Sequence, residues 1–299
     1  MPRIGGTKNH GLIYQGNVWA NTGEYSAGAE TPADRLYRAD NDALVRQVVP
    51  FAGPPVRHLL YHIAPFGGNG VWQWNVAELL KRFNVFNGRR IVAIVTGDDL
   101  DPPFAVKAAF AGHEVTFLEC PNDSDLWEVA TFAAMWEALG PTGPDDMTFY
   151  AHAKGVTRGG DAIVEEWTRI MYHTLLDYLP LVEKMLEREG IAGSFKRFGR
   201  FWEDHCLVRW HYCGTFYWVR NARLPRPGCW HEVHRFWAGT EAWPPVIFPT
   251  GGCVFHEGGP EMAMYDARYM MRVVLPALTV WEQRHAGLET RRVSEGRPR

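Results

Sequence analysis

The segment FYAHAKGVTRGG, at positions 149–160, gathers residue types that bind phosphate. An apolar run, 147–150, leads into His152, Lys154 and Arg158 among three glycines. A lysine that directly follows a parallel strand, beside glycines that let a ligand approach the backbone closely, is suited to neutralising phosphate. Side chains alternate along an extended strand, so His152 and Lys154 lie on the same side. An exposed lysine on a glycine-rich turn is the other interpretation, and one Lys-Gly pair does not decide between them.

A group of acids follows the apolar run RRIVAIVTG. Asp98, Asp99 and Asp101 are close enough in sequence to hold Mg²⁺ or Mn²⁺ together. Acids at the end of a strand also cap helices or contact ribose and base, which needs no metal. The sequence therefore does not require a cofactor. Mn²⁺ or Mg²⁺ bound by these three residues is the alternative.

Two kinds of residue in the second half of the chain suggest sugar chemistry. Trp218 and Trp243 lie beside polar residues, and the faces of tryptophan rings stack on sugars, although most large aromatic residues belong to the core. Glu241, in GTEAWPP, is a candidate general base that would accept a proton from an acceptor hydroxyl. A solvated loop acid is the other interpretation of Glu241.

The histidines of the same region raise a zinc hypothesis. His231 and His234 have H-x-x-H spacing, near Cys229. This is neither the HExxH spacing of zinc proteases nor part of a C-x-x-C ribbon. A metal-dependent hydrolase is therefore the less favoured alternative.

The hydrophobic pattern predicts the elements that position these residues. Four strand-like runs alternate with helical patterns over about a hundred residues, which indicates a mostly parallel α/β sheet of Rossmann-like type. Ligands of such sheets bind beyond the carboxyl ends of the strands. Neither a G-x-G-x-x-G nor a Walker motif is present. The polar residues at the predicted strand ends are His62 with GGNG, Asp98 and Asp99, Asn122 and Asp123, and His152 with Lys154 and Gly155.

The chain is expected to form one large domain between two irregular ends. We predict an irregular arm over 1–50, an α/β domain over 51–290 and a disordered tail over 291–299. Within the domain, 57–160 is the nucleotide-binding half, and 161–290 is an aromatic-rich acceptor half. Long helices are expected at 161–189, with a break near Pro180, and at 263–287.

Composition excludes several classes of protein. The formal net charge is −3 in 299 residues and no run of basic residues occurs, which disfavours nucleic acid as a partner. No apolar run is long enough to cross a bilayer, and the first residues lack the pattern of a signal peptide. A cytoplasmic location is the expectation. The oligomeric state cannot be predicted.

The combination of short motifs resembles a group of bacterial and viral glycosyltransferase-like proteins. The motifs are YHIAP, WQWNVAELLKRFNVFNGRRIVAI, PNDSDLWEVATF, FYAHAKGV and HYCGTFYWVRNARL, which together span roughly 57–245. The resemblance implies an A-type nucleotide-sugar transferase fold, with a nucleoside diphosphate sugar as donor and a glycan as acceptor. The residues that match its pattern are His62, Asn75, Asn87, Asn122, Glu128, His152, Lys154, Gly155, Gly214, Phe216 and Trp218.

The sequence departs from that pattern in two places. Tyr217 stands where the family's G-x-F-W-W segment has tryptophan, which preserves an aromatic surface. The Asp-X-Asp metal motif of many A-type transferases is absent after the fourth strand, where His152-Ala153-Lys154 stands instead. A cationic side chain can offset diphosphate charge without a metal, and Lys154 with Arg158 is the candidate.

The sequence thus predicts a glycosyltransferase that moves a sugar from a nucleoside diphosphate to a carbohydrate hydroxyl. His62 and Asp98 are expected at the nucleoside, Lys154 and His152 at the diphosphate, and Glu241 at the acceptor proton. A carbohydrate-binding protein without catalysis is the alternative from another class. Nucleotide binding distinguishes the two, because a lectin does not require a nucleotide.

Overall fold

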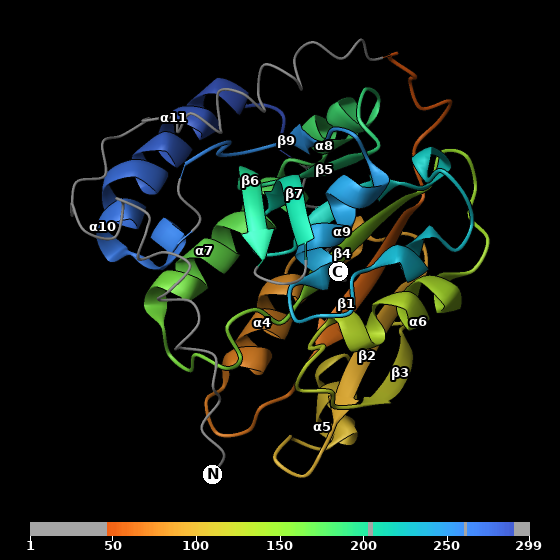
Figure 1. The fold of residues 1–299 in the computed structure, drawn as a ribbon, viewed down its shortest axis with the longest axis vertical. Helices are drawn as coiled ribbons and strands as arrows, with labels where there is room; N and C mark the ends of the chain where they lie inside the picture. Colours follow the sequence, from red (N-terminus) through yellow and green to blue (C-terminus); the bar gives the residue numbers. More distant parts are fainter. Residues whose placement is uncertain (1–46, 203–205, 260–261, 290–299) are drawn as a thin grey trace, which may run out of the picture.

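A seven-stranded, mostly parallel sheet is the centre of the molecule (Figure 1). The computed structural model describes residues 47–202, 206–259 and 262–289. The strand order is β3-β2-β1-β4-β8-β5-β9, and β8 runs against the other six. The strands are β1 (Arg57–Ile63), β2 (Arg90–Thr96), β3 (Thr116–Pro121), β4 (Met147–His152), β5 (Ile191–Gly193), β8 (Tyr217–Arg220) and β9 (Gly252–Cys253).

The predicted α/β class with a mostly parallel sheet is confirmed. The four strands expected from apolar runs are β1 to β4, and they pair in parallel. The inner strands β1, β2 and β4 are buried almost throughout, as expected of parallel strands covered on both faces. Strands from both predicted halves of the domain share this sheet, because β8 pairs with β4.

Helices and loops cover the sheet on two faces, each with its own apolar core. One core contains alternate residues of the strands, such as Leu59, Tyr61 and Phe149, packed with residues of α4 and α7. The other contains Leu60 and Tyr150, packed with residues of α6 and α9. The helices are α4 (Val71–Leu80), α5 (Pro103–Ala109), α6 (Val129–Leu139), α7 (Ala162–Tyr172), α8 (Leu179–Leu186) and α9 (Gly239–Ile247), with a short turn η1 (Phe83–Val85) after α4.

The two long predicted helices are both interrupted. The first divides into α7, a π-helical segment η2 (His173–Asp177) and α8, and Pro180 lies in the first turn of α8. A proline is tolerated there because the first N–H groups of a helix lack partners within the helix. The second consists of η5 (Met262–Tyr265), α10 (Ala267–Tyr269), η6 (Met270–Val274) and α11 (Leu275–His285).

The aromatic-rich segment contributes a separate antiparallel pair, β6 (Lys196–Trp202) and β7 (Cys206–Tyr212). Turns η3 (Asn221–Arg223) and η4 (Cys229–Glu232) follow β8 and precede α9. Figure 1 shows β6 and β7 beside α9, and α10 and α11 at the edge of the molecule. No helix in the described part of the chain has the length and apolar composition needed to cross a membrane.

Two sequence predictions fall wholly or largely outside the described residues. They are the irregular arm over 1–50 and the disordered tail over 291–299. Residues 47–50, which are described, form no regular element.

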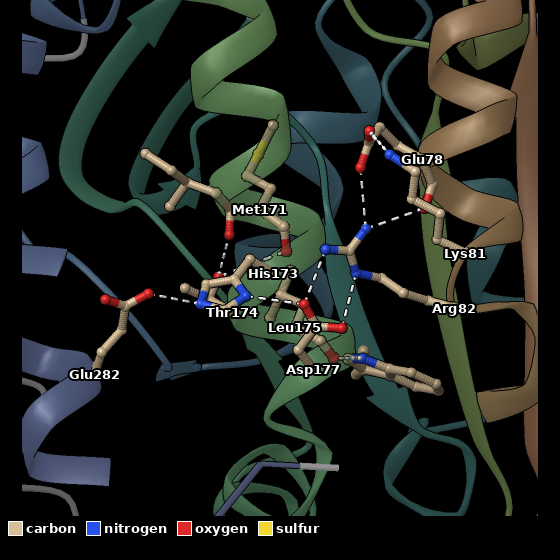
Figure 2. Close-up of polar contacts among 11 residues, drawn as sticks. Glu78, Lys81, Arg82, Met171, His173, Thr174, Leu175, Asp177 and Glu282 are labelled. Atoms are coloured by element: carbon tan, nitrogen blue, oxygen red, sulfur yellow. Dashed lines mark hydrogen bonds and ion pairs between the residues drawn. The ribbon is translucent and has the colours of Figure 1, made fainter. Parts of the chain in front are cut away.

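A chain of charged groups, buried at Arg82 and Asp177 and partly exposed at Glu282, ties the first half of the domain to α11 (Figure 2). Arg82, after α4, donates from Nε and Nη2 to the two carboxylate oxygens of Asp177, both at 2.8 Å. Asp177 Oδ2 also lies 2.9 Å from His173 Nδ1, and His173 Nε2 lies 2.9 Å from Glu282 in α11. Glu78 Oε2 accepts from Arg82 at 3.2 Å and completes the network.

His173 can donate to both carboxylates only when it is protonated. Burial by itself would lower the pKa of His173, but the hydrogen bonds and charges of Asp177 and Glu282 raise it above the usual value of 6.5. A raised pKa in the folded state means that protonation favours folding. The attachment of α11 through His173 is therefore strongest below pH 6.5 and weakens as the pH rises through the folded-state pKa.

We expect the His173→Gln variant to unfold more easily than the wild type, chiefly on the acid side of neutrality. The difference in free energy of unfolding should be about 1–2 kcal/mol near pH ~6 and smaller near pH ~9, because neutral His173 keeps one donor only. Chemical denaturation at both pH values measures it. The control is His231→Gln, since His231 and Glu137 form an exposed pair. An equal loss at both pH values would contradict the prediction.

Candidate functional site

The polar residues of the sheet meet where the strand order reverses. β2 and β3 lie on one side of β1, and β4, β8, β5 and β9 lie on the other. Such a reversal leaves a crevice at the carboxyl ends of the two central strands. The register places His62 of β1 opposite His152 of β4. By strand alternation, both imidazoles lie on the face that α6 covers.

Glu128 forms a buried pair with His152. Its Oε1 lies 3.3 Å from His152 Nδ1 and accepts from the hydroxyl of Thr240 at 2.9 Å. Burial would raise the pKa of Glu128, but His152, His62 and Thr240 together hold it below its usual value, so the side chain is a carboxylate. His152 Nδ1 therefore carries the proton that Glu128 accepts. His152 Nε2 is buried and has no hydrogen-bond partner within the described part of the chain.

His62 is held as a neutral imidazole. Burial is the main cause that lowers its pKa to about 4; Glu128 opposes this shift, and the neighbouring His152 adds to it. His62 Nδ1 lies 2.8 Å from Thr131 Oγ1, and the Thr131 hydroxyl donates to the Glu128 carbonyl at 3.2 Å. The single hydroxyl proton is thus used, so His62 Nδ1 is the donor to Thr131. His62 Nε2 then carries a lone pair.

Asn75 fixes the turn that contains Lys154. From α4, its buried amide donates to the Lys154 carbonyl at 2.9 Å and accepts from the Lys154 N–H at 3.2 Å. Gly155 follows with φ 84°, and a side chain there would lie 2.8 Å from Val164. Lys154 Nζ lies 4.1 Å from the centre of the Trp167 ring. These contacts hold the lysine at the carboxyl end of β4.

Glu241, at the start of α9, contacts the chain between β7 and β8. Its Oε1 accepts from the Gly214 N–H at 3.0 Å, in the β7–β8 connection. Gly214 has φ 100°, and a side chain there would meet Met171 and Trp167 within 3.0 Å. Phe216, two residues later, packs its ring 5.8 Å from that of His152. The candidate base, the glycine and the histidine thus belong to one cluster.

The β7–β8 connection is strained at Thr215. This residue has φ 64°, which is unfavourable for a β-branched side chain, and its buried hydroxyl has no partner among the described residues. Backbone strain of this kind concentrates at functional sites. On the other side of the turn, the exposed Arg158 lies with its guanidinium 4.2 Å from the Tyr265 ring.

The acids after β2 do not join this cluster. Asp98 and Asp99 are exposed, and Asp101 Oδ2 accepts from Trp72 Nε1 at 2.7 Å. Asn122 is exposed after β3, and its N–H donates to the Thr96 carbonyl at 2.9 Å. Over residues 47–202, 206–259 and 262–289, no three His, Cys, Asp or Glu side chains are grouped so that they could hold a metal ion. This includes His231, His234 and Cys229.

Trp218 and Trp243 are core residues, which corrects the expectation that they contact sugar. Both are 0% exposed. The Trp218 indole donates to the Leu175 carbonyl at 2.9 Å, and the Trp243 indole donates to the Cys229 carbonyl at 3.1 Å. Neither ring has a face that a ligand could reach.

Sequence reasoning missed several residues of the cluster. Thr131 follows Glu128 by three positions, a spacing that places both on one side of a helix, and this signal was available. Thr240 and Thr215 had no such signal, because only the tertiary fold brings Thr240 to Glu128 and Phe216, which follows Thr215, to His152. Trp127 and Trp237 were also missed; their rings lie 5.7 Å apart beside the Glu128 segment.

Comparison with known proteins gives little further information. No protein-family model matches the chain, and no curated protein sequence is similar to it. Among solved structures, a candidate nucleotide-diphospho-sugar transferase from Desulfovibrio desulfuricans G20 is similar over 79% of this chain and 97% of its own, with 10% identity and a TM-score of 0.36. At that TM-score the backbones agree too loosely for any property of that protein to be transferred.

We expect Asn75→Ala to destabilise the Lys154 turn. It removes both hydrogen bonds to the Lys154 backbone, and the free energy of unfolding should fall by about 2 kcal/mol. Hydrogen exchange should also accelerate over 152–158, where it reports local opening. Asn122→Ala, at an exposed position, is the control. Unchanged exchange in the Asn75 variant would show that the turn does not depend on the clamp.

Proposed function

We propose that this protein transfers a sugar from a nucleoside diphosphate donor to a carbohydrate hydroxyl, at the crevice between β1 and β4. The observation that carries the proposal is that β1 and β4 place His62 opposite His152, two residues before Lys154, while Thr240, the neighbour of Glu241, bonds the Glu128 partner of His152. The position agrees with the rule for ligand sites in open α/β sheets. The motifs that resemble A-type glycosyltransferases include these strand ends, which supports the same fold type and activity.

Lys154 and Arg158 are assigned to the diphosphate. Departure of a nucleoside diphosphate leaves negative charge on the β-phosphate oxygens, and fixed cations stabilise that charge. Lys154 is held by Asn75 and by the Trp167 ring, so little ordering is required when the phosphate binds. His152 is assigned to the diphosphate as well; because Nδ1 donates to Glu128, this contact requires an imidazolium with its second proton on the buried Nε2.

The residues after β2 do not fit a divalent cation. Asp98 and Asp99 are solvated, and one oxygen of Asp101 is used by Trp72. The proposal therefore takes no step through a metal. Asp98 and Asp99, with Asn122 on the next strand, remain candidates for contacts to ribose and base, and His62 Nε2 offers an acceptor to a nucleoside N–H or O–H.

Glu241 is assigned to the acceptor proton. In a single displacement, the acceptor oxygen attacks the anomeric carbon, the bond from that carbon to the phosphate oxygen breaks, and the carboxylate takes the hydroxyl proton. The Gly214 N–H fixes one oxygen of the carboxylate. Glu241 is half-buried at the start of α9. It directly follows Thr240, whose hydroxyl donates to Glu128.

The first test is calorimetric titration of the protein with UDP, GDP, CDP and dTDP, with Mn²⁺ and then with EDTA. We expect one nucleotide to bind in EDTA, and Lys154→Ala to weaken it about 10- to 100-fold through loss of a charged contact. Lys107→Ala, an exposed lysine paired with Glu119, is the control. Binding that requires Mn²⁺ would assign neutralisation of the diphosphate to a cation held by the acids after β2 instead of to Lys154. No binding would favour the glycan-binding alternative.

The second test separates chemistry from binding. Glu241→Gln keeps an oxygen that can accept from Gly214 but removes the base, so the turnover rate should fall about 10²-fold or more while donor affinity stays unchanged. Release of nucleoside diphosphate, with the donor found by calorimetry and a panel of oligosaccharides, measures turnover. Glu137→Gln, an exposed acid, is the control. Unchanged turnover in Glu241→Gln would remove this assignment.

A further inference from the structure

Trp127 and Trp237 form a partly exposed aromatic pair beside the segment that contains Glu128. Their ring centres lie 5.7 Å apart with an angle of 50° between the planes. Trp127 is 42% exposed, and among the residues whose exposure is described it is the only exposed tryptophan. This contrasts with Trp218 and Trp243, which are closed inside the core.

Trp127 holds an unfavourable backbone conformation. Its φ is 51°, in the left-handed region that large side chains avoid. The conformation is built into a turn in which the Trp127 N–H donates to the Asp123 carbonyl at 2.9 Å, and Asp123 Oδ1 accepts from Asp125 and Leu126. Because Trp127 is 42% exposed, its side chain buries little apolar surface that could offset this strain. Strain without a matching gain in packing points to a use for the exposed ring.

The two tryptophans belong to the segments that build the buried cluster. Trp127 immediately precedes Glu128, and Trp237 precedes Thr240 by three residues. The hydrogen bond from Thr240 to Glu128, at 2.9 Å, joins the two segments directly. Glu241, the proposed acceptor base, follows Thr240. The two tryptophans therefore belong to segments that the Thr240–Glu128 hydrogen bond holds together, and one of these segments contains Glu241.

We propose that Trp127 and Trp237 are a stacking platform for a pyranose ring of the saccharide acceptor. This inference rests on the proposed function, because it names the acceptor side of the same site. The axial C–H groups of a pyranose pack on an indole face, while its hydroxyls need hydrogen-bond acceptors nearby. Asp125, which is exposed two residues before Trp127, supplies carboxylate oxygens. The acids beside the platform select a neutral saccharide over an anionic partner.

The test is native affinity electrophoresis of the full chain in gels that contain neutral polysaccharides, one per gel: dextran, galactomannan, xyloglucan and hydroxyethyl cellulose. We expect at least one of them to retard the wild-type protein. In Trp127→Ala the dissociation constant for that polysaccharide should be roughly tenfold larger. Trp127→Tyr should keep most of the retardation, because it keeps an aromatic face. Phe104→Ala is the matched control: Phe104 is 74% exposed on α5, outside the cluster.

A glycine variant tests whether Trp127→Ala loses retardation only because it is misfolded. Trp127→Gly should be at least as stable as Trp127→Ala, since glycine adopts φ 51° without strain, and it should lose retardation equally. Wild-type protein that no polysaccharide retards, or unchanged retardation in Trp127→Ala and Trp127→Gly, overturns the platform. A loss of nucleotide affinity in Trp127→Ala also overturns it and assigns the ring to the nucleobase.

The failure of this inference can be distinguished from failure of the proposed function. Nucleotide binding that depends on Lys154, without retardation by polysaccharide, would leave the transferase and remove the platform. Retardation that depends on Trp127, without nucleotide binding, would keep the platform and remove the transferase.

Discussion

The parallel pairing of β1 with β4 is the constraint on which the site depends. It fixes His62 opposite His152 at the point where the strand order reverses. Two imidazoles in such proximity, both largely removed from water, cannot both be protonated at low cost. Glu128 resolves this by accepting from His152, while Thr131 accepts from His62. Because the register of the sheet places the two histidines together, it also makes the Glu128 carboxylate necessary.

The surrounding elements serve to hold these groups in one arrangement. Asn75 reaches from α4 to both polar groups of the Lys154 backbone, and Thr240 reaches from α9 to Glu128. Helices on opposite faces of the sheet therefore meet the same strand end. Buried polar groups that are paired with this completeness restrict the number of alternative packings. The unpaired Nε2 of His152 and the strained Thr215 are exceptions.

The second network, around Arg82 and Asp177, has a structural role. It lies between α4, the π-helical segment and α11, and its ion pairs are internal to the molecule (Figure 2). A π-helical segment widens the helix locally and changes which side chains face inward. Here it presents His173 and Asp177, four residues apart, to one another and to two other helices. The same segment accepts the Trp218 indole N–H through Leu175, so the aromatic core and the charged network share one element.

Aromatic residues show how little composition alone decides. Thirteen tryptophans suggested a ligand surface, but the two chosen for their polar neighbours, Trp218 and Trp243, are fully buried. Their ring nitrogens have backbone carbonyl partners, which satisfies the one polar atom that burial would otherwise leave unpaired. Polar neighbours in sequence did not indicate exposure, because adjacent residues on a strand face opposite ways and a helix turns its faces every few residues.

The sequence by itself determined the α/β class, the four parallel strands and the strand ends where polar residues collect. It could do so because apolar runs and helical spacing are local, and because parallel strands align their carboxyl ends. It also singled out His62, Glu128, His152, Lys154 and Glu241. Only the tertiary structure decided which of these residues meet, since Glu241 and Thr240 come from a segment about ninety residues after His152. Contacts across such separations depend on the packing of whole elements, which no local pattern encodes.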